Sequence, residues 1–555
     1  MLATVRGENR WSSPRRWSGI YGWVPIPSNT FCSFISEIFY FSRYERRHLP
    51  KSADFIGFER IAMTHKDADA QDTGFSGKVR SALFWRSGSQ ILAQIISWAS
   101  TLIVIRLLDP SDYGLLAMTQ AILSFMQFLN GYGLVSALVQ SESLDTHKLR
   151  QAFGIMLLLN GTLALLQLGI APLAADYYDQ PLVADMLRVQ ALVYLATPFI
   201  SIPEVLMGRS LDFRRPAIVS LVASASAAAV ALWGALSGWG VWTLVWAPIT
   251  LFWVRGLGYI IATGFLPIPS FDFRGTGSMI AFGAAMLGSQ LLWLVQTQSD
   301  IVIGGRTLHP HELGLYAEAL FLTQIIVSKF IPPLNDVAFP AYARMQADTS
   351  AICWSFLRAL RLIMLVACPL YLGMAATAEP LVLSLFGEKW RDMAPFVELL
   401  ALAMPFMTVQ VMFPPVCNAL GRPGLTTAIS AAGALIMPLA FLLGIRFGAI
   451  GLAWAWLLAY PVFTLVTIRI AGKPFGLRLS ALMRAVAPGV ICSSAMSLIV
   501  LAFDYVLPAD FAAPMRLAIL VAAGGVSFAL LLLIFARATF NDLIRLIIRR
   551  QAEAA

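Results

Sequence analysis

Two stretches of this 555-residue chain, RLLDPSDYGLLA at residues 106–117 and RTLHPHELGLYA at residues 306–317, have similar sequences 200 positions apart. We call them the two copies of the repeated phrase. Each phrase lies between two long apolar runs, which predicts a tight connection between two helices. The proline cannot continue the preceding helix, the acidic residue can accept hydrogen bonds at the next helix start, and the glycine permits close approach. The phrase is therefore predicted to be structural, and its repetition indicates an internal duplication.

The similarity extends beyond the phrase at the same offset of 200, and a second block follows at an offset of 207. Gly, Pro, Arg and Gln in register argue against chance similarity between apolar helices. An even number of helices in each unit would make the two units parallel repeats. The matching pairs include Gly88/Gly288, Ser89/Ser289, Gln90/Gln290, Arg106/Arg306, Pro110/Pro310, Gly114/Gly314, Pro198/Pro405, Phe199/Phe406, Arg215/Arg422 and Pro216/Pro423, with Asp112 and Glu312 matched in charge.

The composition is that of a polytopic membrane protein. The chain is 58% hydrophobic and 13% charged, and its mean hydropathy is +0.72, which is far above what a soluble core requires. Apolar runs of about 20 residues can cross a bilayer as helices, and they are too long for barrel strands. We predict an all-α integral membrane protein with about fourteen transmembrane helices, as two parallel six-helix repeats plus two C-terminal helices. The predicted spans are 83–105, 114–139, 151–174, 186–207, 216–236, 239–262, 277–303, 314–338, 356–378, 396–419, 425–445, 448–468, 484–506 and 514–536.

Four segments follow from this assignment. They are a polar N-terminal extension (1–80), an N-lobe with helices 1–6 (81–265), a C-lobe with helices 7–12 (266–475), and helices 13 and 14 with a basic C-terminal tail (476–555). The first 62 residues lack the ordered regions of a signal peptide. Because an ordinary polar lead-in begins at Met63, we expect the natural chain to start there.

The distribution of basic residues predicts the orientation. By our assignment, one set of alternate loops and termini holds twenty Lys and Arg residues and the other set holds seven. The richer side is expected to be cytoplasmic, which places both termini there. The net charge of +9 then reflects topology and contact with anionic membrane lipids, and no nucleic-acid motif is present. Five scattered cysteines and the His-Pro-His hairpin show no metal-ligand spacing, so neither a metal nor a cofactor is predicted.

The repeated phrase, together with LNDVAFPAYARMQ at residues 334–346, resembles the polysaccharide transporter branch of the multidrug/oligosaccharidyl-lipid/polysaccharide superfamily, the Wzx-type flippases. Within that branch the chain is most similar to the fourteen-helix, WzxC-like exporters. The resemblance covers roughly residues 76–545. It implies two six-helix lobes around a cavity in the bacterial inner membrane. An undecaprenyl-diphosphate-linked oligosaccharide would cross from the cytoplasmic to the periplasmic leaflet there, for exopolysaccharide, capsule or lipopolysaccharide biosynthesis. Polysaccharide polymerase and export machinery are implied partners.

Polar residues gather on single faces of four predicted helices, as a protected path for a charged headgroup requires. On helix 1 the face spans an arc of about 80° at 100° per residue. Helices 1, 2, 7 and 8 are equivalent pairs in the two repeats, so we expect their polar faces to meet across one positively biased cavity. The faces comprise Arg86, Gln90, Gln94, Ser97 and Thr101; Gln120, Ser124, Gln127 and Gly131; Ser289, Trp293, Gln296 and Asp300; and Glu318, Lys329 and Asp336.

Each candidate site residue has two interpretations. Arg86, Lys329 and Arg255 would attract the diphosphate, although Arg86 and Arg255 could instead reach toward the inner headgroups. The glutamines Gln90, Gln94, Gln120, Gln127 and Gln296 would offer hydrogen bonds to sugar rings, and Trp293 an apolar face. Asp300 and Glu318 are candidates for coupling transport to an ion gradient, or they are interfacial or helix-capping carboxylates.

Other functions remain to be weighed against a flippase. A multidrug exporter of the same superfamily, driven by Na⁺ or H⁺, would favour intramembrane acids over bases for a cationic cargo, and this chain offers both. An enzyme such as a polymerase or glycosyltransferase needs a catalytic loop, whereas the predicted external loop 379–395 is short. The glycine-lysine pair at residues 77 and 78 is followed by valine, so there is no Walker A motif to bind ATP. The polar faces argue against a purely structural scaffold.

Overall fold

The computed structural model describes residues 69–128, 146–209, 214–264, 268–272, 277–508 and 511–535. Side chains are described within these ranges except over 69–87, over 277–290 and at a few single positions. The predicted start at Met63 lies outside the described residues. In the part that is described, every regular element is a helix.

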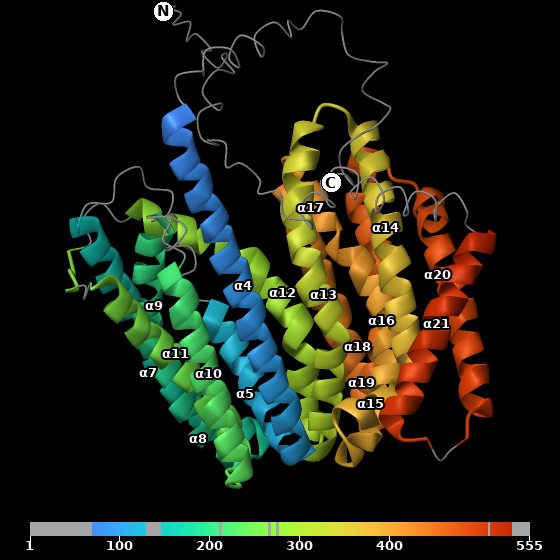
Figure 1. The fold of residues 1–555 in the computed structure, drawn as a ribbon, viewed down its shortest axis with the longest axis horizontal. Helices are drawn as coiled ribbons and strands as arrows, with labels where there is room; N and C mark the ends of the chain where they lie inside the picture. Colours follow the sequence, from blue (N-terminus) through green and yellow to red (C-terminus); the bar gives the residue numbers. More distant parts are fainter. Residues whose placement is uncertain are drawn as a thin grey trace, which may run out of the picture.

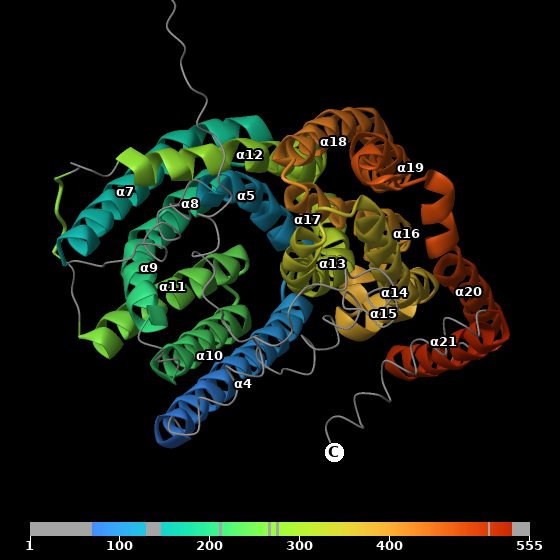
Figure 2. The same ribbon diagram turned by 90° about the horizontal axis from the view of Figure 1, so that it is seen from above.

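The first repeat comprises the helices from α4 to α11, which form one side of the molecule in both views (Figures 1 and 2). We call this set the N-lobe. The helices are α4 (Asp69–Leu107), α5 (Pro110–Phe128), α7 (Thr146–Tyr178), α8 (Pro181–Gln190), α9 (Leu192–Arg209), α10 (Arg214–Leu236) and α11 (Val241–Thr263).

The second repeat comprises the helices from α12 to α19, which we call the C-lobe. Two further helices, α20 and α21, pack at its outer flank beside α14 (Figure 2). The elements are α12 (Gly277–Thr307), α13 (Pro310–Arg344), α14 (Thr349–Ala376), α15 (Ala378–Leu385), η1 (Glu388–Met393), α16 (Ala394–Val411), α17 (Phe413–Ala419), α18 (Pro423–Gly444), η2 (Ile445–Phe447), α19 (Gly448–Ala471), η3 (Lys473–Phe475), α20 (Leu479–Val506) and α21 (Ala513–Phe535).

The predicted number of transmembrane helices is confirmed. Eleven segments of the described chain are long and apolar enough to cross a membrane, and one of them, Pro423–Ala471, contains both α18 and α19. The helices α5 and α12 are not among the eleven, but both pack inside the bundle. Counting α8 with α9 and α16 with α17, the described chain has fourteen transmembrane helices in two six-helix repeats plus two. The domain boundaries at residues 80, 265 and 475 stay predictions.

The apolar core joins the two lobes at one end of the bundle. This is the end at which α4 turns into α5 and α12 turns into α13, the lower end in Figure 1, and we call it the hairpin end. One buried cluster there unites Val104, Ile105 and Tyr113 of the N-lobe with Leu313 and Tyr316 of the C-lobe. Burial of a large apolar side chain contributes about 1.5–3 kcal/mol. The lobes are therefore held together most firmly at the hairpin end.

Candidate functional site

The two copies of the repeated phrase lie against each other at the hairpin end. A Cβ atom at Gly114 would overlap the carbonyl oxygen of Pro310, and a Cβ atom at Gly314 would overlap the carbonyl oxygen of Pro110. The contact is reciprocal, as expected when two equivalent helix starts cross about the axis that relates the repeats. Glycine is needed at both positions because only a residue without a side chain lets the two backbones approach this closely. This crossing of α5 and α13 explains why the chain carries the phrase twice.

The arginine of each copy reaches across to the opposite lobe. Arg106 of the N-lobe donates from Nε to the carbonyl oxygen of Leu385 at 2.9 Å, and from Nη2 to the carbonyl oxygen of Ser384. Arg306 of the C-lobe lies over the ring of Tyr177 in the N-lobe, with its guanidinium carbon 5.0 Å from the ring centroid. Each repeated arginine thus connects its own lobe to the opposite lobe. The local sequence does not reveal this role.

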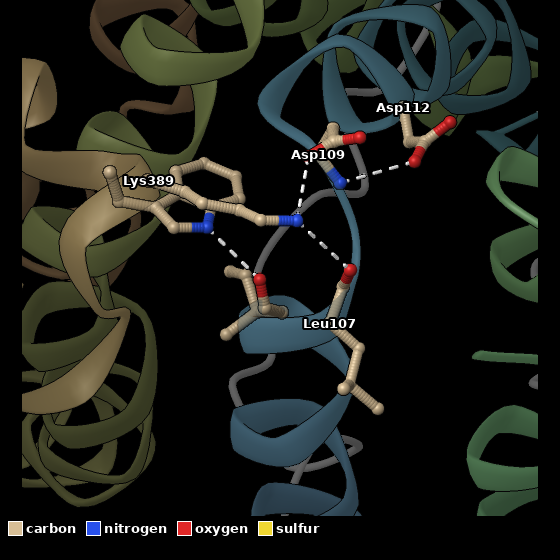
Figure 3. A network of polar contacts seen from close by, with 6 residues as sticks. Leu107, Asp109, Asp112 and Lys389 are labelled. Atoms are coloured by element: carbon tan, nitrogen blue, oxygen red, sulfur yellow. Dashed lines mark hydrogen bonds and ion pairs between the residues drawn. The ribbon is translucent and has the colours of Figure 1, made fainter. Parts of the chain in front are cut away.

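A second group of contacts surrounds the hairpin between α4 and α5 (Figure 3). Lys389 of η1 donates to Asp109 Oδ1 at 2.9 Å and to the carbonyl oxygen of Leu107 at 3.4 Å. The neighbouring Trp390 is fully buried, and its indole N–H donates to the carbonyl oxygen of Ile105 at 3.0 Å. We call the contacts of Arg106, Lys389 and Trp390 with the opposite lobe the clasp.

The acidic residue of the first copy has the local role that its position predicts. Asp112 Oδ2 accepts a hydrogen bond from the backbone N–H of Asp109 at 3.2 Å, one half of a capping box at the start of α5 (Figure 3). In the second copy, His309 caps α13 and its side chain accepts from the N–H of His311 at 3.4 Å. The cap fixes the direction in which each helix leaves the hairpin.

A cavity of about 630 Å³ lies between the lobes, beyond the crossing of α5 and α13. Pockets of roughly 300–1,000 Å³ are typical of small-molecule sites. Six helices supply the walls: four from the N-lobe (α4, α5, α10 and α11) and two from the C-lobe (α12 and α13). The cavity is thus built where both repeats meet, as a transporter needs. Its polar lining comprises Ser97, Ser100, Thr101, Tyr113, Gln120, Ser124, Ser224, Thr243, Thr297, Gln298, Glu318 and Gln324.

The structure brings only part of the predicted site to this cavity. Gln120 and Glu318 line it, as do Ser97, Thr101 and Ser124 from the predicted faces of helices 1 and 2. Seven other candidates are not among its described lining residues: Gln90, Gln94, Gln127, Arg255, Trp293, Gln296 and Lys329. Arg86 lies in α4 where side chains fall outside the described residues. Substrate contact stays a prediction for all of the candidates, including Gln120 and Glu318.

The polar face predicted for helix 7 is turned toward its own lobe. Gln296 is buried against α18, where a Cβ atom at Gly433 would overlap its side-chain oxygen. Trp293 is 46% exposed. The cavity instead receives Thr297 and Gln298, which lie on the adjacent face of α12. The expected positive bias of the cavity is also wrong for its described walls, because the charged residue among them is the carboxylate of Glu318.

Asp300 belongs to a buried network in the C-lobe. Its carboxylate accepts hydrogen bonds from the Tyr316 hydroxyl at 2.7 Å and from the Trp456 indole N–H at 3.2 Å. The same indole N–H lies 2.7 Å from the Tyr316 hydroxyl oxygen. All three side chains are fully buried, so the interpretation of Asp300 as an interfacial carboxylate is wrong. Asp300 directly precedes Ile301, which lines the cavity, so the network lies next to the cavity wall along α12.

Two cationic candidates continue the cavity walls away from the hairpin end. Arg255 follows Leu251, a lining residue, by four positions on the same face of α11. Its Nη2 lies 3.6 Å from Glu204 Oε1, and its Nε donates to the Tyr259 hydroxyl at 3.2 Å. Lys329 is exposed and follows Glu318 by eleven positions on one face of α13, about 16 Å along the axis at 1.5 Å per residue.

Two cavity residues carry no signal in the sequence. Thr243 lines the cavity, but Trp239, Gly240, Trp246 and Ala247 stand one turn away on either side and mark no polar face. Tyr113 also lines the cavity, and it lies within the first repeated phrase, which predicts only a local turn. The packing of the two lobes reveals both positions.

Loss of one hydrogen bond of the clasp is expected to weaken the contact between the two lobes at the hairpin end. Trp390→Phe keeps an aromatic ring but removes the N–H that donates to Ile105, which is expected to cost about 1 kcal/mol and to shift the closed-to-open ratio at the hairpin end about fivefold. Spin labels at Leu107 and Thr307, both exposed at the hairpin end, would measure the distance distribution. Trp454→Phe on the exposed face of α19 is the matched control. An unchanged distribution in Trp390→Phe would contradict a role of the clasp in closure.

Solved structures with the same fold are known. The lipid II flippase MurJ in an inward closed conformation superimposes with a TM-score of 0.64 at 12% identity, covering 83% of this chain and 99% of that one. A multidrug resistance MATE family transporter in an inward-facing conformation gives a TM-score of 0.55 at 14% identity, covering 71% of this chain and 99% of that one. At these identities the likeness shows the fold alone.

Relatives of known sequence are found in several bacteria. ExoT of Rhizobium meliloti, a succinoglycan biosynthesis transport protein, is 26% identical over 368 residues, covering 66% of this chain and 74% of the relative. TuaB of Bacillus subtilis, a teichuronic acid biosynthesis protein, is 25% identical over 417 residues, covering 74% and 85%. WzxC of Escherichia coli, a lipopolysaccharide biosynthesis protein, is 21% identical over 404 residues, covering 72% and 81%.

A family model described as "Polysaccharide biosynthesis protein" matches residues 103–395. This match spans more than half of the chain and contains both copies of the repeated phrase, the crossing of α5 and α13, and the clasp. The chain is a multi-pass membrane protein that belongs to the polysaccharide biosynthesis protein family.

Proposed function

We propose that this protein is a flippase that moves undecaprenyl-diphosphate-linked oligosaccharide across the bacterial inner membrane by alternating access, for exopolysaccharide, capsule or lipopolysaccharide biosynthesis. The observation that carries the proposal is a polar cavity between two repeats whose walls come from both lobes. Such a cavity can shelter a polar headgroup from hydrocarbon while the lipid tail stays outside. The transport and lipopolysaccharide roles named for ExoT and WzxC support it.

Charge along the cavity walls suggests how the headgroup would lie. Hydroxyl and amide groups line the cavity near the hairpin end, whereas Arg255 and Lys329 continue the same helix faces toward the opposite end. We therefore place the glycan in the cavity and the diphosphate beside Arg255 and Lys329. Arg86, on the predicted polar face of α4, is placed beside the diphosphate as well. Gln90, Gln94 and Gln127 extend the lining faces of α4 and α5 in that direction and would offer hydrogen bonds along the path. Trp293 and Gln296 stay candidates for sugar contact only in a conformation that turns α12.

The orientation in the membrane follows from the same proposal. The hairpin end would face the periplasm and both termini the cytoplasm, because the basic residues gather in the loops of the opposite end. The described interlobe contacts of the clasp would then close the periplasmic side. We take the protein to be a transporter and not an enzyme, with membrane lipids around it and polysaccharide polymerase and export machinery as partners.

Two carboxylates are our candidates for coupling transport to an ion gradient. Asp300 is fully buried in the C-lobe network, where a change of protonation or a bound cation would alter its hydrogen bonds to α13 and α19. Glu318 lines the cavity directly. Both lie on helices whose starts or ends meet at the hairpin end, so a change at either can reach the contact between the lobes.

A multidrug exporter of the same superfamily is the second candidate. One observation favours it: the charged group among the described cavity-lining residues is a carboxylate, which suits an organic cation. Deletion of the gene separates the two functions. A flippase is expected to leave lipid-linked oligosaccharide accumulated and surface polymer lost, whereas drug sensitivity with normal surface glycan would support the exporter and refute our proposal.

Neutralising Lys329 tests the placement of the diphosphate. Because a hydrogen bond to a charged group contributes about 1.5–3 kcal/mol, Lys329→Gln is expected to lower glycan export about tenfold or more while leaving membrane abundance unchanged. Lys329→Arg, which keeps the charge, should retain export, and Lys473→Gln in the exposed η3 turn is the matched control. Normal export in Lys329→Gln would remove this residue from the mechanism.

A further inference from the structure

The cavity walls have the hydrogen-bonding character of a carbohydrate site. Eleven uncharged polar residues from six helices line it. Eight carry hydroxyl groups on serine, threonine or tyrosine, and three are the glutamines Gln120, Gln298 and Gln324. Hydroxyl and amide groups both donate and accept, which matches the hydroxyls of a sugar. Phe321, a lining residue that is 56% exposed, and the alanines of α10 offer apolar surface to the C–H faces of sugar rings.

Two of these hydroxyls have no partner of their own. Tyr113 is 5% exposed and Thr243 is fully buried. Within the described residues, the Tyr113 hydroxyl and Thr243 Oγ1 have no hydrogen-bond partner. A buried hydroxyl without a partner costs free energy, so these two groups are expected to bind something that enters the cavity. They come from α5 and α11 and place hydrogen-bonding groups on two walls.

The charge of the walls limits what can enter. Among the described lining residues there is no Lys, Arg or His, and Glu318 is the charged group. A carboxylate on an incoming sugar would lose its water without gaining a cation, and it would lie near a second carboxylate; both effects oppose its entry. Arg255 and Lys329 lie outside the cavity on the side away from the hairpin end, where the diphosphate is placed.

We infer that this cavity is a binding site for an uncharged, hydroxyl-rich segment of the glycan, and that Glu318 is the residue that discriminates against acidic sugars there. The inference rests on the proposed flippase function and narrows its substrate class. The glycan segment next to the diphosphate would carry no uronic acid, acidic acyl group or other anionic substituent. Glu318 accepts hydrogen bonds from a neutral sugar and disfavours an anionic one.

The test compares two synthetic lipids in vesicles that contain the purified full-length chain. Both are undecaprenyl-diphosphate trisaccharides that end in the same neutral hexose, one with three neutral hexoses and one with a hexuronic acid as the unit next to the diphosphate. The initial rate at which each glycan becomes accessible to an impermeant glycosidase is measured under an imposed Na⁺ or H⁺ gradient. The variants are Glu318→Gln and Glu318→Lys, and Glu379→Gln at the exposed end of α15 is the matched control. The ratio of the two rates does not depend on how much variant protein folds.

We expect the native chain to move the neutral lipid about tenfold faster or more. Whatever its effect on the neutral rate alone, Glu318→Gln should narrow the difference between the two rates, and Glu318→Lys should raise the acidic-to-neutral rate ratio about tenfold. Equal native rates for the two lipids, or a Glu318→Lys ratio like that of Glu379→Gln, would overturn the specificity while leaving the flippase intact. Equal loss of both rates in Glu318→Gln would assign the residue to ion coupling instead. Movement of neither lipid by the native chain would overturn the flippase function itself.

Discussion

Replacing Gly114 or Gly314 with leucine is expected to abolish transport while the protein still inserts into the membrane. Each new side chain would overlap a backbone carbonyl oxygen of the opposite hairpin, Pro310 or Pro110, which cannot move aside as a flexible side chain could. Overpacking of this kind costs about 1–3 kcal/mol, and that cost falls only on the arrangement in which α5 and α13 touch. The closed-to-open ratio at the hairpin end should therefore drop roughly 5- to 150-fold.

Distance measurement and transport together test this prediction. Spin labels at Leu107 and Thr307, at equivalent positions of the two repeats, should move to longer distances in both leucine variants. Gly169→Leu is the matched control, because this glycine of α7 has open space where its Cβ would be. If Gly114→Leu and Gly314→Leu keep native distances and native export, the crossing does not serve alternating access.

Asp300→Asn is expected to lower ion-driven transport about tenfold or more, which is within the 5- to 150-fold range of ordinary coupling between two sites. Asparagine keeps an oxygen that can accept from the Tyr316 hydroxyl and the Trp456 indole N–H. It cannot ionise, so it loses any response to protons or to a bound cation. Thermal stability in detergent should fall only modestly, because the amide nitrogen replaces the oxygen that accepts from the Ile301 N–H at 2.8 Å. Transport under an imposed gradient should fall far more.

A set of neighbouring variants distinguishes coupling from a purely structural role. Tyr316→Phe and Trp456→Phe each remove one donor and should lower stability by about 1 kcal/mol without removing the response to a gradient. Asp392→Asn, an exposed change in η1, is the matched control. If Asp300→Asn retains gradient-driven transport, or if all three network variants lose stability and transport in parallel, Asp300 has only a structural role.

The sequence predicted the number of helices and the positions of the connections well, because both follow from local features. Apolar run length sets the fourteen helices, and proline followed by an acid and glycine sets the two hairpins. The faces of α4 and α5 were also placed correctly at Ser97, Thr101, Gln120 and Ser124. On these helices the polar residues recur with helical spacing, and their apolar neighbours leave one direction for the polar face.

The face of α12 could not be assigned in the same way. Helical spacing correctly groups Gln296 with Asp300, but it does not tell which neighbour that face meets. The answer depends on Gly433, which leaves room for Gln296 in α18, and on Trp456, which lies 156 positions from the Asp300 carboxylate that it contacts. Contacts at such separations depend on how whole helices pack. For the same reason, the reciprocal contact of the two hairpins could not be predicted from the sequence, although both contacting segments lie within the repeated phrase.

The central claim is that the two repeats enclose a path for a lipid-linked glycan and close it where their repeated phrases cross. The most direct measurement is movement of an undecaprenyl-diphosphate trisaccharide of neutral hexoses in vesicles that contain the purified chain under an imposed ion gradient. The account predicts rapid movement with the native chain and none above protein-free vesicles with Gly114→Leu. Native vesicles that move this lipid no faster than protein-free vesicles, while they accumulate an organic cation, would contradict it.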